Sequence, residues 1–336
     1  MPMFMSRPPK IGLALGGGAA RAFSHIGVIA ALKKRGIPID IVTGTSMGAI
    51  IGAMYAARGD EEELKKKIVA YLQSEEFASS GFAFFRDLDA EGEGLLFKLG
   101  QLARRGVFNA LMVTRTALVS DETAMRNYAC LVDDMAIEET RIPFAAVALD
   151  LGSGEGVVLD RGPLRRAIAA SCAMPGILSP VEHEGRLLID GGWVEAVPAR
   201  AARQLGADFV IAVDVGESPQ GLDTPRNALD VISRADTLVR RALAVEQLKA
   251  ADIVLCPQNG VPHWADFSTT EQAIAQGEKE VARRITELRR VIGKARRRSW
   301  WSLAGDMSES TGPAENPQEM EADAGTAVPQ GSKGAS

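Results

Sequence analysis

The sequence is poor in cysteine and in histidine, with three of each among its 336 residues. The cysteines Cys130, Cys172 and Cys256 are widely spaced and include no C-x-x-C pair, which argues against a disulfide framework and against a thiolate metal site. Three histidines are too few for a histidine-rich metal centre. We therefore expect free thiols, a reducing compartment and no bound metal or other cofactor.

Charge and hydropathy exclude further classes of protein. The formal net charge is −5, so the chain has no overall attraction for nucleic acid. No run reaches the roughly 18 uninterrupted apolar residues of a membrane-spanning helix. The first ten residues also lack the apolar core of a signal peptide. With 46% hydrophobic and 24% charged residues, the composition is that of a folded globular protein, which we expect in the cytoplasm.

Short apolar runs alternate with segments of helical periodicity. Residues 10–15 predict a buried strand, and residues 19–35 predict a helix because apolar residues recur at spacings of three or four. A second strand at residues 39–43 leads into a helix rich in small side chains. Further strands are predicted at 143–149, 157–159, 187–190, 209–215 and 253–257, and long helices at 226–249 and 270–295. This alternation is typical of a mostly parallel α/β fold.

Two segments differ from the rest in composition. Residues 75–120 are rich in Phe and Leu, and they fit either an insertion packed on the core or a cap that lines the entrance for an apolar substrate. Residues 306–336 contain almost no large apolar side chains. Because such a segment cannot bury enough surface to offset the entropy of ordering, we expect a disordered tail.

The first motif with chemical content is G-x-S-x-G, from Gly44 to Gly48 with Ser46 at its centre. It lies between a predicted strand and a predicted helix, which is the context of a nucleophile elbow. Glycines on either side allow the backbone to pass the serine closely, and the helix that follows directs its positive end at the hydroxyl. The alternative is a glycine-rich turn with an incidental serine.

The second motif is the glycine loop Gly16, Gly17, Gly18, followed by Ala19, Ala20 and Arg21. Its backbone N–H groups can converge on an anion, either a nucleotide phosphate or the oxyanion of an acyl transfer. No G-K-[ST] follows, and Arg21 stands where a dinucleotide fingerprint needs its third glycine. The oxyanion interpretation fits better, with Arg21 as a support for the loop, a contact for a substrate phosphate or a surface ion-pair partner.

The third motif is Asp190-Gly191-Gly192, at the end of a predicted strand. An aspartate is ionised at neutral pH and can accept the proton of a serine, although Asp-Gly is also a common turn. A histidine triad would need one of three candidates. His25 lies in the first helix, His183 at a hairpin tip and His263 in a late loop. A structural or solvent-facing role is expected for each, and His263 is the strongest candidate for a triad because of its place in chain order.

Together and in this order, the three motifs resemble the patatin-like phospholipase family. Its pattern is a glycine-rich loop ending in a basic residue, then G-x-S-x-G, then D-G-G or D-G-A. The segment from Ala170 to Gly176 also resembles the A-S-x-A-x-P segment of that family. One departure is Ala22, where many members carry glycine, and we expect the loop to tolerate this small change.

The resemblance implies a fold, a site and an activity. The fold is a three-layer α/β/α domain with a mostly parallel central sheet, its catalytic region at residues 11–198 and an extension of the same domain at 199–300. Ser46 is the implied nucleophile and Asp190 the base of a Ser–Asp dyad. Gly44, Gly48, Gly191 and Gly192 support these two residues, and Gly16 to Ala19, Arg21 and Met47 form the oxyanion hole and substrate contacts.

The implied reaction is hydrolysis of phospholipid or lysophospholipid acyl esters without a metal. Two alternatives remain: an acyltransferase that uses the same acyl-enzyme, and a non-catalytic lipid-binding protein. Residues from Arg289 to Leu303 are basic and then contain tryptophan, which suits peripheral contact with the inner face of an anionic membrane or simply ends a charged helix.

Overall fold

One sheet carries the structure. The computed structural model describes residues 8–78, 117–216, 224–225, 227–257 and 265–309. The eight strands of its sheet are β1 (Ile11–Leu15), β2 (Ile41–Thr45), β3 (Phe144–Asp150), β4 (Gly156–Leu159), β5 (Val181–His183), β6 (Arg186–Asp190), β7 (Phe209–Val213) and β8 (Ile253–Leu255). The order is β5-β6-β3-β2-β1-β7-β8, and β4 also pairs with β3.

Strand direction divides the sheet into two parts. The pairs β1–β2, β1–β7, β2–β3 and β7–β8 are parallel, whereas β4, β5 and β6 pair antiparallel at the side of β3. Strands β1, β2 and β7 are buried at every position, as their continuous apolar runs require. The predicted mostly parallel α/β fold is therefore confirmed.

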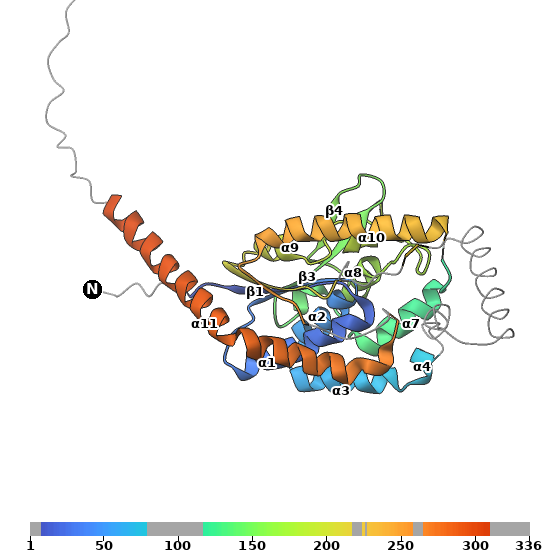
Figure 1. The fold of residues 1–336 in the computed structure, drawn as a ribbon, viewed down its shortest axis with the longest axis horizontal. Coiled ribbons are helices and arrows are strands. Elements are labelled where there is room, and N and C mark those ends of the chain that lie inside the picture. The colour runs from blue at the N-terminus through green and yellow to red at the C-terminus, as the bar shows by residue number, and fades with distance from the viewer. Residues whose placement is uncertain (1–7, 79–116, 217–223, 226, 258–264, 310–336) are drawn as a thin grey trace, which may run out of the picture.

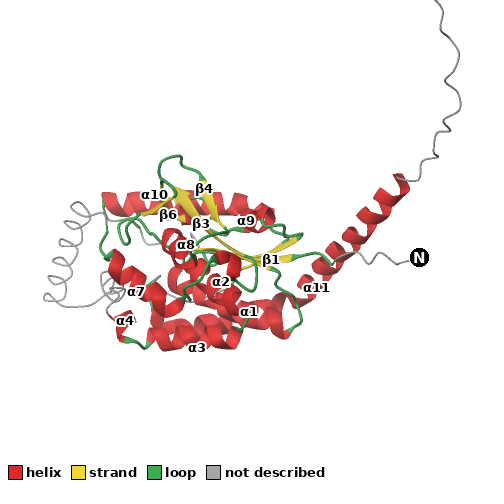
Figure 2. Cartoon of the chain, turned by 180° about the vertical axis from the view of Figure 1, so that it is seen from behind, coloured by secondary structure: helices red, strands yellow, loops and turns green. Residues whose placement is uncertain are grey.

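Helices cover both faces of the sheet, which gives three layers (Figure 1). One face carries α9 (Ala199–Gln204) and α10 (Ala228–Gln247). The other carries α1 (Ser24–Lys34), α2 (Met47–Arg58), α3 (Glu61–Leu72) and α11 (Thr270–Glu309), and the view from behind shows the same layers (Figure 2). The shorter helices are α4 (Glu75–Ala78), α7 (Asp121–Leu131) and α8 (Leu164–Ser171).

Most predicted elements are present with shifted ends. The predicted helix at 19–35 begins as a 3-10 turn, η1 (Ala19–Phe23), before α1 starts, and Ala22 is fully buried in that turn. The expected hairpin at His183 is confirmed, but its first strand, β5, was not predicted. Helix α11 runs on to Glu309, so residues 306–309 of the expected tail are helical. Residues 310–336, and 79–116 of the segment at 75–120, lie outside the described residues.

Helix α11 is fixed to α1 by two glycines that let the backbones touch. A Cβ at Gly27 would lie 1.9 Å from the carbonyl oxygen of Ile274, and one at Gly277 would lie 2.0 Å from that of Ser24. Such distances leave no room for any side chain. Beyond this contact, the C-terminal part of α11 extends away from the body of the molecule (Figure 1).

We expect Gly277→Ala to lower the free energy of unfolding by about 1–3 kcal/mol, because the new methyl group forces α11 away from α1. Gly293→Ala is the matched control on the same helix, since nothing lies within 4 Å of the added atom. It should raise stability by up to about 1 kcal/mol through helix propensity alone. Urea unfolding of both variants measures the two effects, and equal shifts would contradict the proposed close contact.

Candidate functional site

Ser46 occupies a strained turn between β2 and α2. Its φ of 55° and ψ of −128° are unfavourable for any residue with a side chain. The turn is closed by close backbone approach: a Cβ on Gly44 would lie 2.4 Å from the Cα of Ala49, and one on Gly48 would lie 2.3 Å from the carbonyl oxygen of Leu15. The expected strand–turn–helix elbow is therefore present, with its glycines required by packing.

Ser171 holds this strained turn through its side-chain hydroxyl. The backbone N–H of Ser46 donates to Ser171 Oγ at 3.0 Å, and the Ser171 hydroxyl donates to the carbonyl oxygen of Val147 at 2.7 Å. Ser171 is fully buried at the end of α8. Sequence analysis included Ser171 only within a resembling segment, and its role in the turn depends on a strand pairing that no local pattern reveals.

The register of β3 brings Asp190 to the same place. Strand β4 pairs with residues 146–149 along one edge of β3. Strand β2 pairs with residues 144–147 and strand β6 with residues 148–150. Because both overlap β4 in register, both must lie on the other edge of β3. Thr45 is paired with Val147, and Asp190 is paired with the next residue, Ala148. Strands β2 and β6 thus point at one another end to end, and Ser46 meets Asp190 where they converge.

Asp190 is a buried carboxylate with few compensating contacts. Its side chain is 2% exposed, and Oδ1 accepts the backbone N–H of Gly192 at 2.8 Å. Burial raises the pKa of Asp190 from 3.8 to about 6, and this rise is opposed by a side-chain hydrogen bond with Ser46. The Ser46 hydroxyl therefore lies near enough to influence the ionisation of a carboxylate whose basicity is raised by burial.

The glycine loop passes beside Ser46, but its first two amides are already engaged. Gly16 N–H donates to the carbonyl oxygen of Val213 at 3.0 Å, and Gly17 N–H donates to that of Ala196 at 2.9 Å. A Cβ on Gly17 would lie 3.2 Å from the Cβ of Ser46. Gly16 and Gly17 therefore shape the loop, and we correct the expectation that their amides are anion donors. Within the described chain, the amides of Gly18, Ala19 and Met47 have no hydrogen-bond acceptor.

His25 supports the glycine loop and makes no hydrogen bond to Ser46. It is fully buried, with Nε2 2.7 Å from the carbonyl oxygen of Gly16, and burial lowers its pKa to about 4, which keeps the ring neutral. His183 lies in the β5–β6 hairpin, and His263 falls outside the described residues. Arg21 is partly buried in η1, one turn after the loop.

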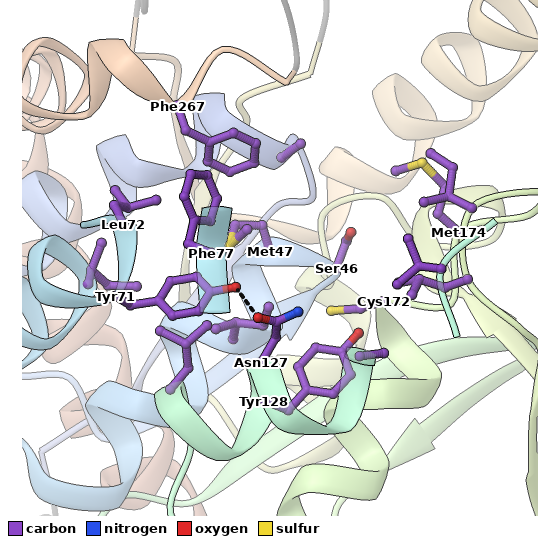
Figure 3. A pocket seen from close by; sticks show the side chains of 18 of the residues that line it. Ser46, Met47, Tyr71, Leu72, Phe77, Asn127, Tyr128, Cys172, Met174 and Phe267 are labelled. Carbon is purple, nitrogen blue, oxygen red and sulfur yellow. Dashed lines mark hydrogen bonds between the residues drawn. The ribbon is translucent and has the colours of Figure 1, made fainter. Parts of the chain in front are cut away.

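An apolar pocket leads to Ser46 (Figure 3). It encloses about 890 Å³ between the protein atoms, part of it open to solvent. Figure 3 shows Tyr71, Leu72 and Phe77 on one side, and Ser46, Cys172 and Met174 on the other. The remaining lining residues are Ala19, Phe23, Met47, Ile50, Ile68, Val119, Ala124, Asn127, Tyr128, Leu131, Ile177, Leu178 and Phe267.

The few polar groups of this pocket are paired or neutral. Tyr71 donates its hydroxyl hydrogen to Asn127 Oδ1 at 3.0 Å, and Asn127 Nδ2 donates to the carbonyl oxygen of Thr123. Burial raises the pKa of the Cys172 thiol and of the Tyr128 phenol well above their usual values, so both stay uncharged. The pocket therefore offers an apolar ligand an uncharged wall.

A family model described as patatin-like phospholipase matches residues 13–203, more than half of the chain. The chain belongs to the patatin-like phospholipase family. The match spans the glycine loop, the serine elbow and the Asp190 turn, and the first two of these segments contribute residues to the pocket wall.

Curated relatives share sequence with this chain, and solved structures match it at low identity. The chain is 35% identical over 222 residues to an uncharacterised NTE family protein of Mycobacterium tuberculosis, covering 64% of this chain and 52% of that protein. It is 30% identical over 232 residues to lysophospholipase nte1 of Emericella nidulans, covering 69% and 13% respectively. Human GIVD cytosolic phospholipase A2 matches in structure with a TM-score of 0.44 and 13% identity, over 86% of this chain and 60% of that one. The chain thus spans about half the length of the mycobacterial relative.

Two further observations concern cofactors and membranes. Among the described residues, no three His, Cys, Asp or Glu side chains are grouped as metal ligands would be. None of the helices in the described part of this patatin-like chain is both long and apolar enough to cross a bilayer.

Burial of Asp190 predicts how stability depends on pH. Because the folded pKa is above the unfolded one, this carboxyl stabilises the fold below about pH 4, and the contribution is lost as pH rises through about 6. Two pKa units correspond to about 3 kcal/mol. Asp190→Asn should therefore unfold at a higher temperature than the wild type at pH 8, and the difference should shrink below pH 6. A difference that is constant between pH 4 and 8 would contradict the raised pKa.

Proposed function

We propose that the protein is a serine acyl-ester hydrolase in which Ser46 is the nucleophile and Asp190 the general base. The observation that carries the proposal is the pair itself: a hydroxyl on a strained elbow at the wall of an apolar pocket, and a buried carboxylate that β3 brings beside it. Among the described residues, no histidine is hydrogen-bonded to Ser46 or Asp190, so the proposed reaction uses only two side chains.

In the first half of the reaction, Ser46 Oγ attacks the ester carbonyl while its proton passes to Asp190. The developing oxyanion accepts hydrogen bonds from amides at the Gly18–Ala19 turn and from Met47 N–H at the start of α2, where the helix dipole favours negative charge. The tetrahedral intermediate collapses, and the leaving alcohol takes the proton from Asp190. The product is an acyl-Ser46 ester.

In the second half, Asp190 takes a proton from water, and the resulting hydroxide equivalent attacks the acyl-Ser46 carbonyl. Collapse releases the fatty acid, and Ser46 Oγ recovers its proton from Asp190. A base with a pKa of about 6 is ionised at neutral pH and is more basic than an ordinary carboxylate. Burial of Asp190 therefore provides the basicity that a triad obtains from histidine.

The pocket supports an acyl chain as the part of the substrate that is bound. Its walls are mostly apolar and uncharged, and Ser46 lies among the residues that line it. We place the ester carbonyl at Ser46 and the chain toward Leu72 and Phe77. Phospholipids and lysophospholipids meet this description, and relatives named lysophospholipase favour them.

The basic part of α11 supports peripheral membrane contact in the cytoplasm. Arg289, Arg290, Lys294, Arg296 and Arg297 are all exposed along one stretch of the helix. Such a cluster attracts anionic lipid headgroups by roughly 1 kcal/mol for each basic residue at the surface. The side chains of residues 298–303 of the predicted contact lie outside those described.

The nucleophile is tested by labelling with a fluorophosphonate, followed by mass-spectrometric mapping. We expect label on Ser46, about 100-fold slower labelling in Asp190→Asn, and loss of ester hydrolysis by about 10⁴-fold or more in Ser46→Ala. Asp160→Asn is the control, because this half-buried carboxylate pairs, among the described residues, only with its neighbour Arg161.

Three outcomes would change the assignment. Undiminished hydrolysis by folded Ser46→Ala would exclude Ser46 as the nucleophile. A folded wild-type protein that binds lipid but takes no label would indicate the non-catalytic alternative. Acyl transfer to an added alcohol in preference to water would indicate an acyltransferase that uses the same acyl-Ser46 intermediate.

Cosedimentation with vesicles tests the membrane contact. We expect binding to vesicles that contain anionic lipid, weak binding to neutral vesicles, and loss of binding at high salt. Charge reversal at Arg289 and Arg290 should weaken this binding and leave hydrolysis of a soluble ester unchanged. Equal binding to neutral and anionic vesicles would contradict the electrostatic contact.

A further inference from the structure

Helix α10 is attached to the molecule mainly by polar contacts. Among its described side chains, only Ala244 and Gln247 are buried. The large apolar side chains that the structure describes on this helix face outward instead, with Ile232 63% exposed and Val239 68% exposed. An amphipathic helix ordinarily packs through its apolar side, so what holds α10 in place must be found on its polar side.

That polar side contacts the turn that carries Asp190. Trp193, three residues after Asp190, donates its indole N–H to Asp236 Oδ1 at 3.1 Å. Arg240 lies over the Trp193 ring, with its guanidinium carbon 4.7 Å from the ring centroid, and its Nε donates to Asp236 Oδ2 at 2.7 Å. The three side chains form a closed group in which each contacts the other two.

A second contact on the same helix helps to align this group. Gln247 Nε2 donates to the carbonyl oxygen of Val194, the residue after Trp193. Asp236, Arg240 and Gln247 are four and seven residues apart, so they share one face of α10. The turn after Asp190 is therefore held to the helix at two consecutive residues.

We propose that Arg240, stacked on Trp193 and paired with Asp236, is a positioning residue that fixes the Asp190 turn in its reactive arrangement with Ser46. This inference rests on the proposed function. Arg240 does not touch the substrate pocket, and it acts through Trp193 on a turn that Gly191 and Gly192 leave without side chains of their own.

Arg240 also interacts electrostatically with Asp190. The groups that face this carboxyl are the Ser46 hydroxyl at the start of α2, the Cys172 thiol after α8, the Tyr128 phenol on α7 and the Arg240 guanidinium on α10. Of these, only Arg240 is charged at neutral pH, and it lowers the pKa of Asp190 against the effect of burial. Removing this charge must raise the pH at which Asp190 ionises.

Arg241 provides the matched control. It follows Arg240 on the same helix and is similarly buried, but its guanidinium pairs with Asp214 at 2.5 Å, at the end of β7. Arg241→Met removes one attachment of α10 and leaves the group around Trp193 intact. Arg240→Met removes the guanidinium from that group, and Arg240→Lys keeps the charge but not the flat, stacked donor.

Two measurements are made on each variant: the pH profile of kcat/KM with a soluble ester, and the pH dependence of the unfolding temperature with Asp and with Asn at position 190. The second reports ionisation of Asp190 without any turnover. For Arg240→Met we expect kcat/KM to fall about ten-fold or more at pH 8, with the acid limb and the unfolding transition both moved to higher pH. Arg240→Lys should restore the position of the limb and only part of kcat/KM.

Two different results would contradict the two proposals. If Arg240→Met and Arg241→Met lose the same activity and neither moves the acid limb or the unfolding transition, Arg240 only attaches a helix and the proposal is wrong. If the wild-type protein hydrolyses no ester, the proposed function fails. The unfolding titration alone then decides whether Arg240 acts on Asp190.

Discussion

The site depends on the way in which β2 and β6 both pair with strand β3. Its residues 144–147 pair with β2 and residues 148–150 with β6, on one edge, so a parallel strand and an antiparallel strand end against each other. Ser46 follows one of them, and Asp190 ends the other. The carbonyl oxygen of Val147, at the junction, accepts the hydroxyl of Ser171, which in turn binds the Ser46 backbone. Backbone pairing thus places the hydroxyl and the carboxylate before any side-chain interaction refines them.

Burial has opposite consequences for the pKa values of Asp190 and His25. For Asp190 it raises the pKa to about 6, which destabilises the folded state at neutral pH but makes the carboxylate a better base. For His25 it lowers the pKa to about 4, so the ring stays neutral and serves the carbonyl of Gly16 as a fixed partner. The same desolvation therefore favours proton transfer at one position and suppresses it at the other.

The elements that sequence could predict are those with a local signal. The G-x-S-x-G turn, the glycine loop and the strand before Asp190 each carry their pattern within a few residues, and the structure contains all three. Which loop amides are free could not be predicted, because Gly16 and Gly17 bond to Val213 and Ala196, far along the chain. Nor could local pattern show that β6 pairs on the same edge of β3 as β2.

Helix α10 shows that Ser46 and the turn after Asp190 are held in place by different kinds of contact. Ser46 begins α2, whose residues from Gly48 to Ala56 are all buried, so core packing fixes the serine. The Asp190 turn is covered by a helix whose apolar residues face outward and whose contacts with the turn are hydrogen bonds and a stacked cation. Packing energy is insensitive to small shifts in direction, whereas hydrogen bonds are directional. Strand pairing therefore places Asp190, a few polar contacts refine the turn after it, and core packing holds Ser46.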